Sequence, residues 1–206
     1  MSDVTVLKPA TARHPEVRRE RCVDGGTVVK DYRHLRGWRR MMARWILARE
    51  ERAYRILEGF NGAPRCFGRE GALSIRLEFI EGKPCGLLED EGLAHTIPPE
   101  FFDRVGQLVE ELHHRGVAHN DLKRARNILV ATDGRPVLID FAAAVWRAPR
   151  WNPLRVLLFH QLCKVDHNAV AKLKRRFVPH LLNDDERRRL DHPTMLERMA
   201  RRLLHR

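Results

Sequence analysis

The sequence predicts an α+β fold, with strands concentrated in the first 79 residues and helices in the remainder. Three observations support this. Short β-branched runs bounded by turn residues, the pattern of strands, occur at 27–32 and 72–79. Apolar residues recur at spacings of three and four over 37–58 and again after Pro98, the pattern of helices. The chain has 206 residues, which is long enough to bury a core, and it has no internal repeat.

The first strand and the helix after it each carry a charged residue in an apolar setting. The strand Thr27–Tyr32 follows a Gly-Gly turn and contains Lys30. In the helix predicted over 37–58, Glu50 falls on the apolar stripe and Glu51 does not. A buried carboxylate is costly unless it is paired, and Lys30 is the cation that we expect beside Glu50. The alternative is that both glutamates balance arginines on a solvated face. The stripe consists of Trp38, Met42, Trp45, Ile46, Ala53, Ile56 and Leu57.

The later elements follow in order. A strand over 72–79 is ended by a break at Ile80–Pro84, and Pro98-Pro99-Glu100 opens a helix that stops at Gly116. Its apolar face is formed by Phe101, Phe102, Val105, Leu108, Val109 and Leu112. Two more helices are predicted nearer the C-terminus, with apolar faces made by Leu154, Val156, Leu157, Leu158, Leu162 and Val165 in one and by Leu190, Leu196, Met199 and Leu203 in the other.

A hairpin is predicted between the helix that stops at Gly116 and the helix that contains Leu154. Two short apolar runs, one ending at Val130 and the other beginning at Val137, flank a segment rich in turn residues. With Val130 opposite Val137, the antiparallel register pairs Asn127 with Asp140, roughly 5 Å apart. An amide oxygen and a carboxylate then converge, and such hard oxygen ligands suit Mg²⁺.

The loop before this hairpin holds further reactive groups. It reads His119-Asn120-Asp121-Leu122-Lys123. Asp121 is placed to accept the proton of an attacking hydroxyl, and Lys123 to neutralise charge on a moving phosphoryl group. His119 is expected to support the loop through hydrogen bonds. Asp166, on the predicted helix downstream, is either a brace for this loop or an ordinary surface carboxylate.

Together these residues resemble the protein-kinase-like superfamily. The resemblance rests on the His-x-Asp-Leu-Lys loop, the downstream Asn127 and the Asp-Phe pair at Asp140. It implies a single domain, 1–206, with a two-lobed protein-kinase-like fold. The small strand-rich N-lobe would span 1–79 and the reduced helical C-lobe 80–206.

The resemblance also implies ATP and Mg²⁺ as cofactors and assigns a role to each motif residue. Asp121 would be the catalytic base and Lys123 the phosphate-contacting lysine. Lys30, oriented by Glu50, would hold the nucleotide phosphates. Asn127 and Asp140 would be the metal ligands, and the hinge backbone from Glu78 to Ile80 would hold adenine.

Three departures from the common kinase pattern point to smaller relatives. Asn127 stands six residues after Asp121 where five is usual, and Ala142 replaces the glycine after Asp140-Phe141. No glycine-rich loop precedes the first strand, so Thr11, backbone amides or arginines would have to cover the phosphates. RIO-type kinases and the bacterial lipopolysaccharide-kinase group show comparable departures and are the closer match.

The charge balance indicates acidic partners. The chain has 39 Lys and Arg against 27 Asp and Glu, a formal net charge of +12. Nucleic acid, ATP, anionic lipid and lipopolysaccharide all fit such a surface. The four scattered cysteines predict neither a zinc site nor a disulfide framework. With no signal-like or membrane-spanning stretch, we expect a cytoplasmic protein, either free or peripheral to the inner membrane. Its basic C-terminal helix either packs its apolar side on the domain, which we favour, or lies on an anionic membrane surface.

The expected function is therefore an ATP- and Mg²⁺-dependent phosphotransferase acting on a hydroxyl. The acceptor is either a protein serine or threonine, which we favour, or a sugar of an envelope lipopolysaccharide. The alternative is a catalytically inactive kinase-like basic module that binds nucleic acid or an anionic membrane surface.

Overall fold

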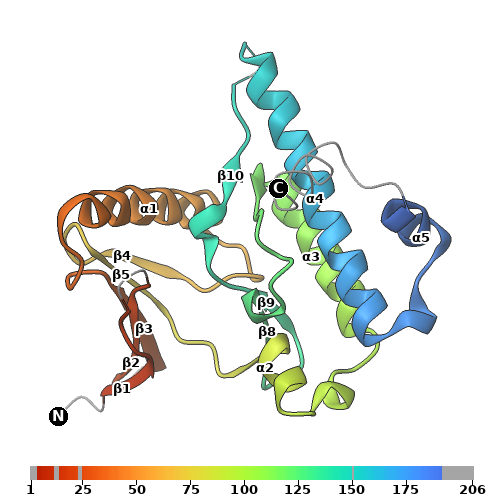
Figure 1. Ribbon diagram of the computed structural model, residues 1–206, viewed down its shortest axis with the longest axis horizontal. Helices are drawn as coiled ribbons and strands as arrows, with labels where there is room; N and C mark the ends of the chain where they lie inside the picture. The colour runs from red at the N-terminus through yellow and green to blue at the C-terminus, as the bar shows by residue number, and fades with distance from the viewer. Residues whose placement is uncertain (1–3, 12–13, 23–24, 150, 192–206) are drawn as a thin grey trace, which may run out of the picture. The chain divides into compact units, whose positions relative to one another are not determined.

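The computed structural model describes residues 4–11, 14–22, 25–149 and 151–191, and the chain forms two compact units (Figure 1). The first unit contains residues 1–81 together with 139–142, and the second contains 82–138 and 143–206. Strands dominate the first unit and helices the second, so the predicted α+β class is confirmed. Among the described residues, no helix is long and apolar enough to cross a membrane.

The first unit is an antiparallel five-stranded sheet with one long helix, α1 (Gly37–Ile56). The strand order is β1-β2-β3-β5-β4. Both predicted strands are present, as β3 and β5. The Gly-Gly turn predicted before β3 is wrong, because Gly25 and Gly26 belong to the strand and pair with Cys22 and Arg21. Residues 23 and 24 lie outside the described residues. The strands are β1 (Val4–Lys8), β2 (Glu16–Cys22), β3 (Gly25–Asp31), β4 (Cys66–Arg69) and β5 (Ser74–Glu78).

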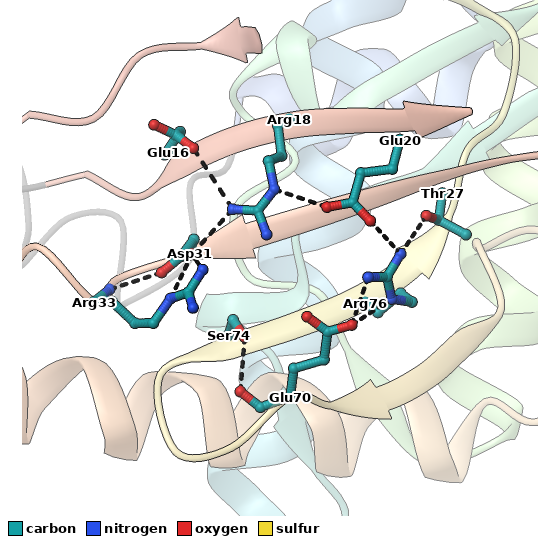
Figure 2. Close-up of polar contacts among 9 residues, drawn as sticks. All are labelled: Glu16, Arg18, Glu20, Thr27, Asp31, Arg33, Glu70, Ser74 and Arg76. Carbon is teal, nitrogen blue, oxygen red and sulfur yellow. Dashed lines mark hydrogen bonds and ion pairs between the residues drawn. The ribbon is translucent and has the colours of Figure 1, made fainter. Parts of the chain in front are cut away.

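One face of this sheet carries a network of ion pairs, which Figure 2 shows. Arg18 on β2 contacts Glu20 at 2.8 Å and Asp31 at 3.0 Å, and Arg76 on β5 contacts Glu20 at 2.7 Å. In the strand register Val29 lies between the two arginines and is fully buried. The arginine stems therefore cover an apolar side chain while their charged ends are paired along the strands.

We expect this network to make part of the stability acid-sensitive. Burial raises the pKa of Asp31, but hydrogen bonds from Arg33 and Arg18 outweigh it and bring the pKa from 3.8 to about 2. Because the folded-state pKa is depressed, the stabilisation is complete above about pH 4 and is lost as the pH falls toward 2. Urea unfolding should show Asp31→Asn to be less stable than wild type at neutral pH, with the gap closing toward pH 2. A gap that does not change with pH would contradict this assignment.

Helix α1 buries the second half of the predicted stripe, including Glu50 and Ala53, but not the first half. Its buried residues are Ala43, Leu47, Glu50, Ala53 and Tyr54, and it packs against β4 and β5. Two small alanines on this face allow close approach to the sheet. The expected core positions Trp38, Met42 and Trp45 are instead 68%, 41% and 54% exposed, so the first half of the predicted stripe is wrong.

The second unit is mainly helical. Its helices are α2 (Cys85–Asp90), α3 (Phe101–His114), α4 (Pro153–Phe177) and α5 (Asp184–Asp191). Its strands form a sheet in the order β6-β8-β9, from β6 (Gly82–Pro84), β8 (Ile128–Ala131) and β9 (Pro136–Leu138), and a pair of β7 (Val117–Ala118) with β10 (Val145–Trp146).

The predicted hairpin exists as β8 and β9, but its register is one residue different. Ile128 pairs with Leu138 and Val130 with Pro136. The turn explains the shift, because Gly134 adopts a left-handed backbone with φ of 78° and Ala131 donates its N–H to the Arg135 carbonyl at 3.0 Å. The ladder ends at Ile128, so the expected pairing of Asn127 with Asp140 within it is wrong.

Helix α4 begins where its sequence provides a cap. The Asn152 side chain accepts the backbone N–H of Arg155 at 3.2 Å, and Pro153 occupies the first helical position. The predicted core helix is present but longer, and its first turns do not face the core, since Leu154, Leu157 and Leu158 are exposed. Helix α5 covers the start of the predicted C-terminal helix. The remaining expected apolar positions, Leu196, Met199 and Leu203, lie outside the described residues.

Candidate active site

Within the first unit, Lys30, Glu50 and Asp140 form a charged cluster. Lys30 Nζ lies 2.5 Å from Glu50 Oε1 and 3.0 Å from Asp140 Oδ1. Strand β3 holds the lysine and α1 the glutamate, so the structure brings the sequence-predicted pair together. Glu50 is fully buried and the Lys30 side chain is 13% exposed, whereas Asp140 keeps 43% of its side chain exposed. The accessible member of the cluster is therefore a carboxylate.

The two carboxylates in this cluster keep Lys30 charged. Burial lowers the pKa of Lys30, but the carboxylates of Asp140 and Glu50 raise it by more, so the pKa ends well above its ordinary value. Burial raises the pKa of Glu50, which the Lys30 charge offsets only in part. A lysine held as an ammonium ion can donate hydrogen bonds to phosphate oxygens.

The segment that carries Asp140 has an unusual backbone. Asp140 has φ of +68°, in the left-handed region that non-glycine residues rarely adopt. Phe141 is fully buried and packs edge-on against Tyr54, with ring centroids 5.1 Å apart. Since Tyr54 lies one helical turn after Glu50, α1 fixes both the lysine's partner and the aromatic anchor next to Asp140. Strained backbone of this kind is characteristic of functional sites.

Within the second unit, Asp121 and Asn127 are joined across the loop. The Asn127 side-chain amide donates to the Asp121 carbonyl at 3.0 Å and to its carboxylate at 3.2 Å. Arg124 lies 3.1 Å from the same carboxylate. The structure thus places the predicted base and one predicted metal ligand side by side. Arg124, which sequence reasoning did not single out, belongs to the segment with the extra residue.

A buried aspartate holds this loop by its main chain. Asp166 on α4 accepts the backbone N–H of His119 at 2.7 Å and that of Asn120 at 2.8 Å, and His113 lies 3.1 Å from the same carboxylate. Asp166 is fully buried, so the brace, rather than the surface carboxylate, is its role. Asn120 has φ of +62°, and the aspartate stabilises this left-handed turn immediately before Asp121.

The other predicted residues lie where the sequence placed them, without contacts that define a role. Lys123 is exposed. Glu78 ends β5, and its backbone N–H donates to the Arg65 carbonyl at 2.8 Å. Ile80 lies between β5 and β6 and is half-buried. The hydroxyl of Thr11, between β1 and β2, accepts the backbone N–H of His14 at 3.0 Å.

Each unit holds one hard oxygen donor of the kind that Mg²⁺ prefers. In the second unit the Asn127 amide nitrogen is engaged by Asp121, which leaves its oxygen as a donor. In the first unit Asp140 has a carboxylate side chain that is 43% exposed. Mg²⁺ usually takes only one or two protein ligands and fills its remaining positions with water and phosphate oxygens. Among the described residues, no group of three or more His, Cys, Asp and Glu side chains forms a metal cage.

A strand lysine paired with a helix glutamate, and a braced loop with an Asp and an Asn, are features that this chain shares with protein-kinase-like proteins. The model of the lipopolysaccharide kinase (Kdo/WaaP) family matches residues 87–159, a stretch that includes Asp121, Asn127 and Asp140. The predicted resemblance and fold class are therefore confirmed, and the match supports a phosphotransferase of the kinase class.

The chain is also similar to three archaeal proteins, each named probable bifunctional tRNA threonylcarbamoyladenosine biosynthesis protein. The identity is 39% over 70 residues for the protein of Methanosarcina acetivorans, 37% over 70 residues for that of Methanosarcina mazei and 33% over 72 residues for that of Methanosarcina barkeri. These matches cover 34% to 35% of this chain and 11% of each relative.

Proposed function

We propose that this protein transfers the γ-phosphate of ATP to a hydroxyl group in an Mg²⁺-dependent reaction. The observation that carries the proposal is the braced loop, because Asp166 fixes the backbone immediately before Asp121 and Asn127 fixes its carboxylate. A general base held this way can receive a proton from an incoming hydroxyl without first being reoriented.

Each residue then has one task. Lys30, oriented by Glu50, binds the nucleotide phosphates, and the backbone at Ile80 contacts adenine. Asn127 and Asp140 hold Mg²⁺, which when bound neutralises charge on the phosphates. Asp121 takes the hydroxyl proton as the new oxygen–phosphorus bond forms and the bond to the leaving ADP breaks. Lys123 neutralises charge on the transferred phosphoryl group.

The acceptor is a protein serine or threonine, or a sugar of a lipopolysaccharide. The motif loop favours the former by its likeness to protein kinases, and the matched family is described as lipopolysaccharide kinases. Because the archaeal relatives are matched over only 11% of their length, we assign no tRNA-related role from their name.

Transfer of labelled γ-phosphate from ATP tests the proposal. The protein would be incubated alone, with a mixed set of acceptor proteins and with purified lipopolysaccharide, each with Mg²⁺ or with a chelator in its place. We expect Mg²⁺-dependent label in one acceptor class. Absence of transfer in every arm, combined with binding to RNA or anionic lipid, would instead support the inactive basic module.

A further inference from the structure

An apolar stripe on α1 faces away from the sheet. Trp38, Met41, Met42 and Trp45 are 68%, 67%, 41% and 54% exposed. Their spacing of three, four and seven residues places them on one side of the helix, whereas Leu47 and Glu50 lie on its buried side. Exposed patches of large apolar side chains mark interaction sites in soluble proteins. The proposed phosphotransfer gives this stripe no role.

Arginines flank the stripe along the sequence. Between Asp31 and Glu50 the chain has six arginines and no acidic residue. Two of them stack on the stripe's aromatic rings, Arg39 at 5.6 Å from the Trp38 centroid and Arg49 at 4.4 Å from that of Trp45. The partner must therefore present a surface that accepts apolar side chains and also carries negative charges next to them, within reach of the arginines.

We propose that this face of α1 binds the surface of an anionic phospholipid bilayer. Tryptophan and arginine together suit the headgroup region, where rings meet acyl chains and guanidinium groups meet phosphates. A nucleic acid would use the arginines but would leave the two methionines without a partner. The occupant that uses the whole stripe is the lipid surface.

A second exposed patch points to the same partner. At the start of α4, Trp151, Leu154, Leu157 and Leu158 are 81%, 78%, 57% and 45% exposed, and Arg155 lies among them. Each of the two units thus presents a tryptophan, long aliphatic side chains and arginine to solvent. A bilayer is a continuous surface, so it can bind both patches. A protein partner would need a separate complementary surface for each patch.

Vesicle flotation of the full chain tests the proposal, independently of phosphoryl transfer. We expect binding to vesicles that contain phosphatidylglycerol, little binding to phosphatidylcholine alone, and release by salt. Joint replacement of Trp38→Ala and Trp45→Ala should weaken binding at least about tenfold, because each buried ring contributes a large apolar area. Phe67→Ala is the matched control, since Phe67 is 57% exposed on β4 of the same unit, and it should bind like wild type.

A spectroscopic readout locates the contact. The protein has four tryptophans, so replacing Trp146 and Trp151 with Phe leaves fluorescence from Trp38 and Trp45 alone. Brominated phosphatidylglycerol should quench that fluorescence. Unquenched emission in this variant would overturn the proposal. Unchanged flotation of the folded Trp38/Trp45 double variant would overturn it as well. So would a result in which replacing Trp38 and Trp45 weakens binding to RNA but not binding to lipid vesicles. Asp121→Asn should float like wild type, which separates failure of this surface from failure of the phosphotransferase.

Discussion

Replacement of Asp121 with asparagine is expected to lower the rate of phosphoryl transfer by about a thousandfold while changing ATP affinity by less than about twofold. Asparagine has the same shape and keeps an oxygen that can accept the Asn127 amide, so the loop is retained. It cannot take a proton from the acceptor hydroxyl. The loss should therefore fall on kcat and leave nucleotide binding intact.

Two variants make this test specific. Lys30→Met removes the charge that Glu50 and Asp140 hold in place, and it should weaken ATP binding, the property that Asp121→Asn preserves. Asp133→Asn makes the same chemical change at an exposed aspartate of the hairpin turn and should leave transfer unchanged. Single-turnover rates and titration with a fluorescent ATP analogue supply the two measurements. Equal transfer rates for Asp121→Asn and Asp133→Asn would refute the role of Asp121.

Replacement of Asp166 with alanine is expected to lower the free energy of unfolding by about 3 kcal/mol. The change leaves the backbone N–H groups of His119 and Asn120 without their acceptor in a buried setting, and each such group costs about 1–3 kcal/mol. Transfer should fall as well, by roughly a hundredfold, because a base displaced by about 1 Å works poorly. Urea denaturation and kcat measured at a temperature where the variant is folded would report the two effects.

A matched surface change separates the brace from a general loss of charge. Glu111 on α3 is an exposed carboxylate of the same unit that pairs with Arg115 one turn away. Glu111→Ala should alter the free energy of unfolding by less than about 0.5 kcal/mol. If Asp166→Ala were as mild as Glu111→Ala, the aspartate would not hold the loop.

The sequence was most informative where a charge stood in an apolar pattern. Glu50 could be distinguished from Glu51 because burial of a carboxylate requires a cation, and Lys30 was the available one. The hairpin and α3 were predictable from short-range signals, namely turn residues between apolar runs and a proline-opened helix. These elements are set by residues close together in the sequence, so the spacing of apolar and turn residues predicts them.

The errors arose where tertiary contacts decide between alternatives that the local pattern allows. The hairpin register depends on the left-handed Gly134, and nothing in the apolar runs fixes it. Helix α1 has two apolar stripes, and only packing on the sheet decides that Leu47, not Trp45, faces the core. Asp166 could have been favoured from one signal, since it is the only acidic residue among the 25 residues of α4.

The contact between Asp166 and the loop is made to main-chain N–H groups, so the brace is indifferent to the identity of the loop's side chains. Loop shape and loop chemistry are thereby under separate control. Arg126 is exposed and pairs with Asp90, not with Asp121, so it can be exchanged without touching the hydrogen bonds that set the backbone. A scaffold organised in this way can acquire a new acceptor by changes in this segment alone, while the position of its general base stays the same.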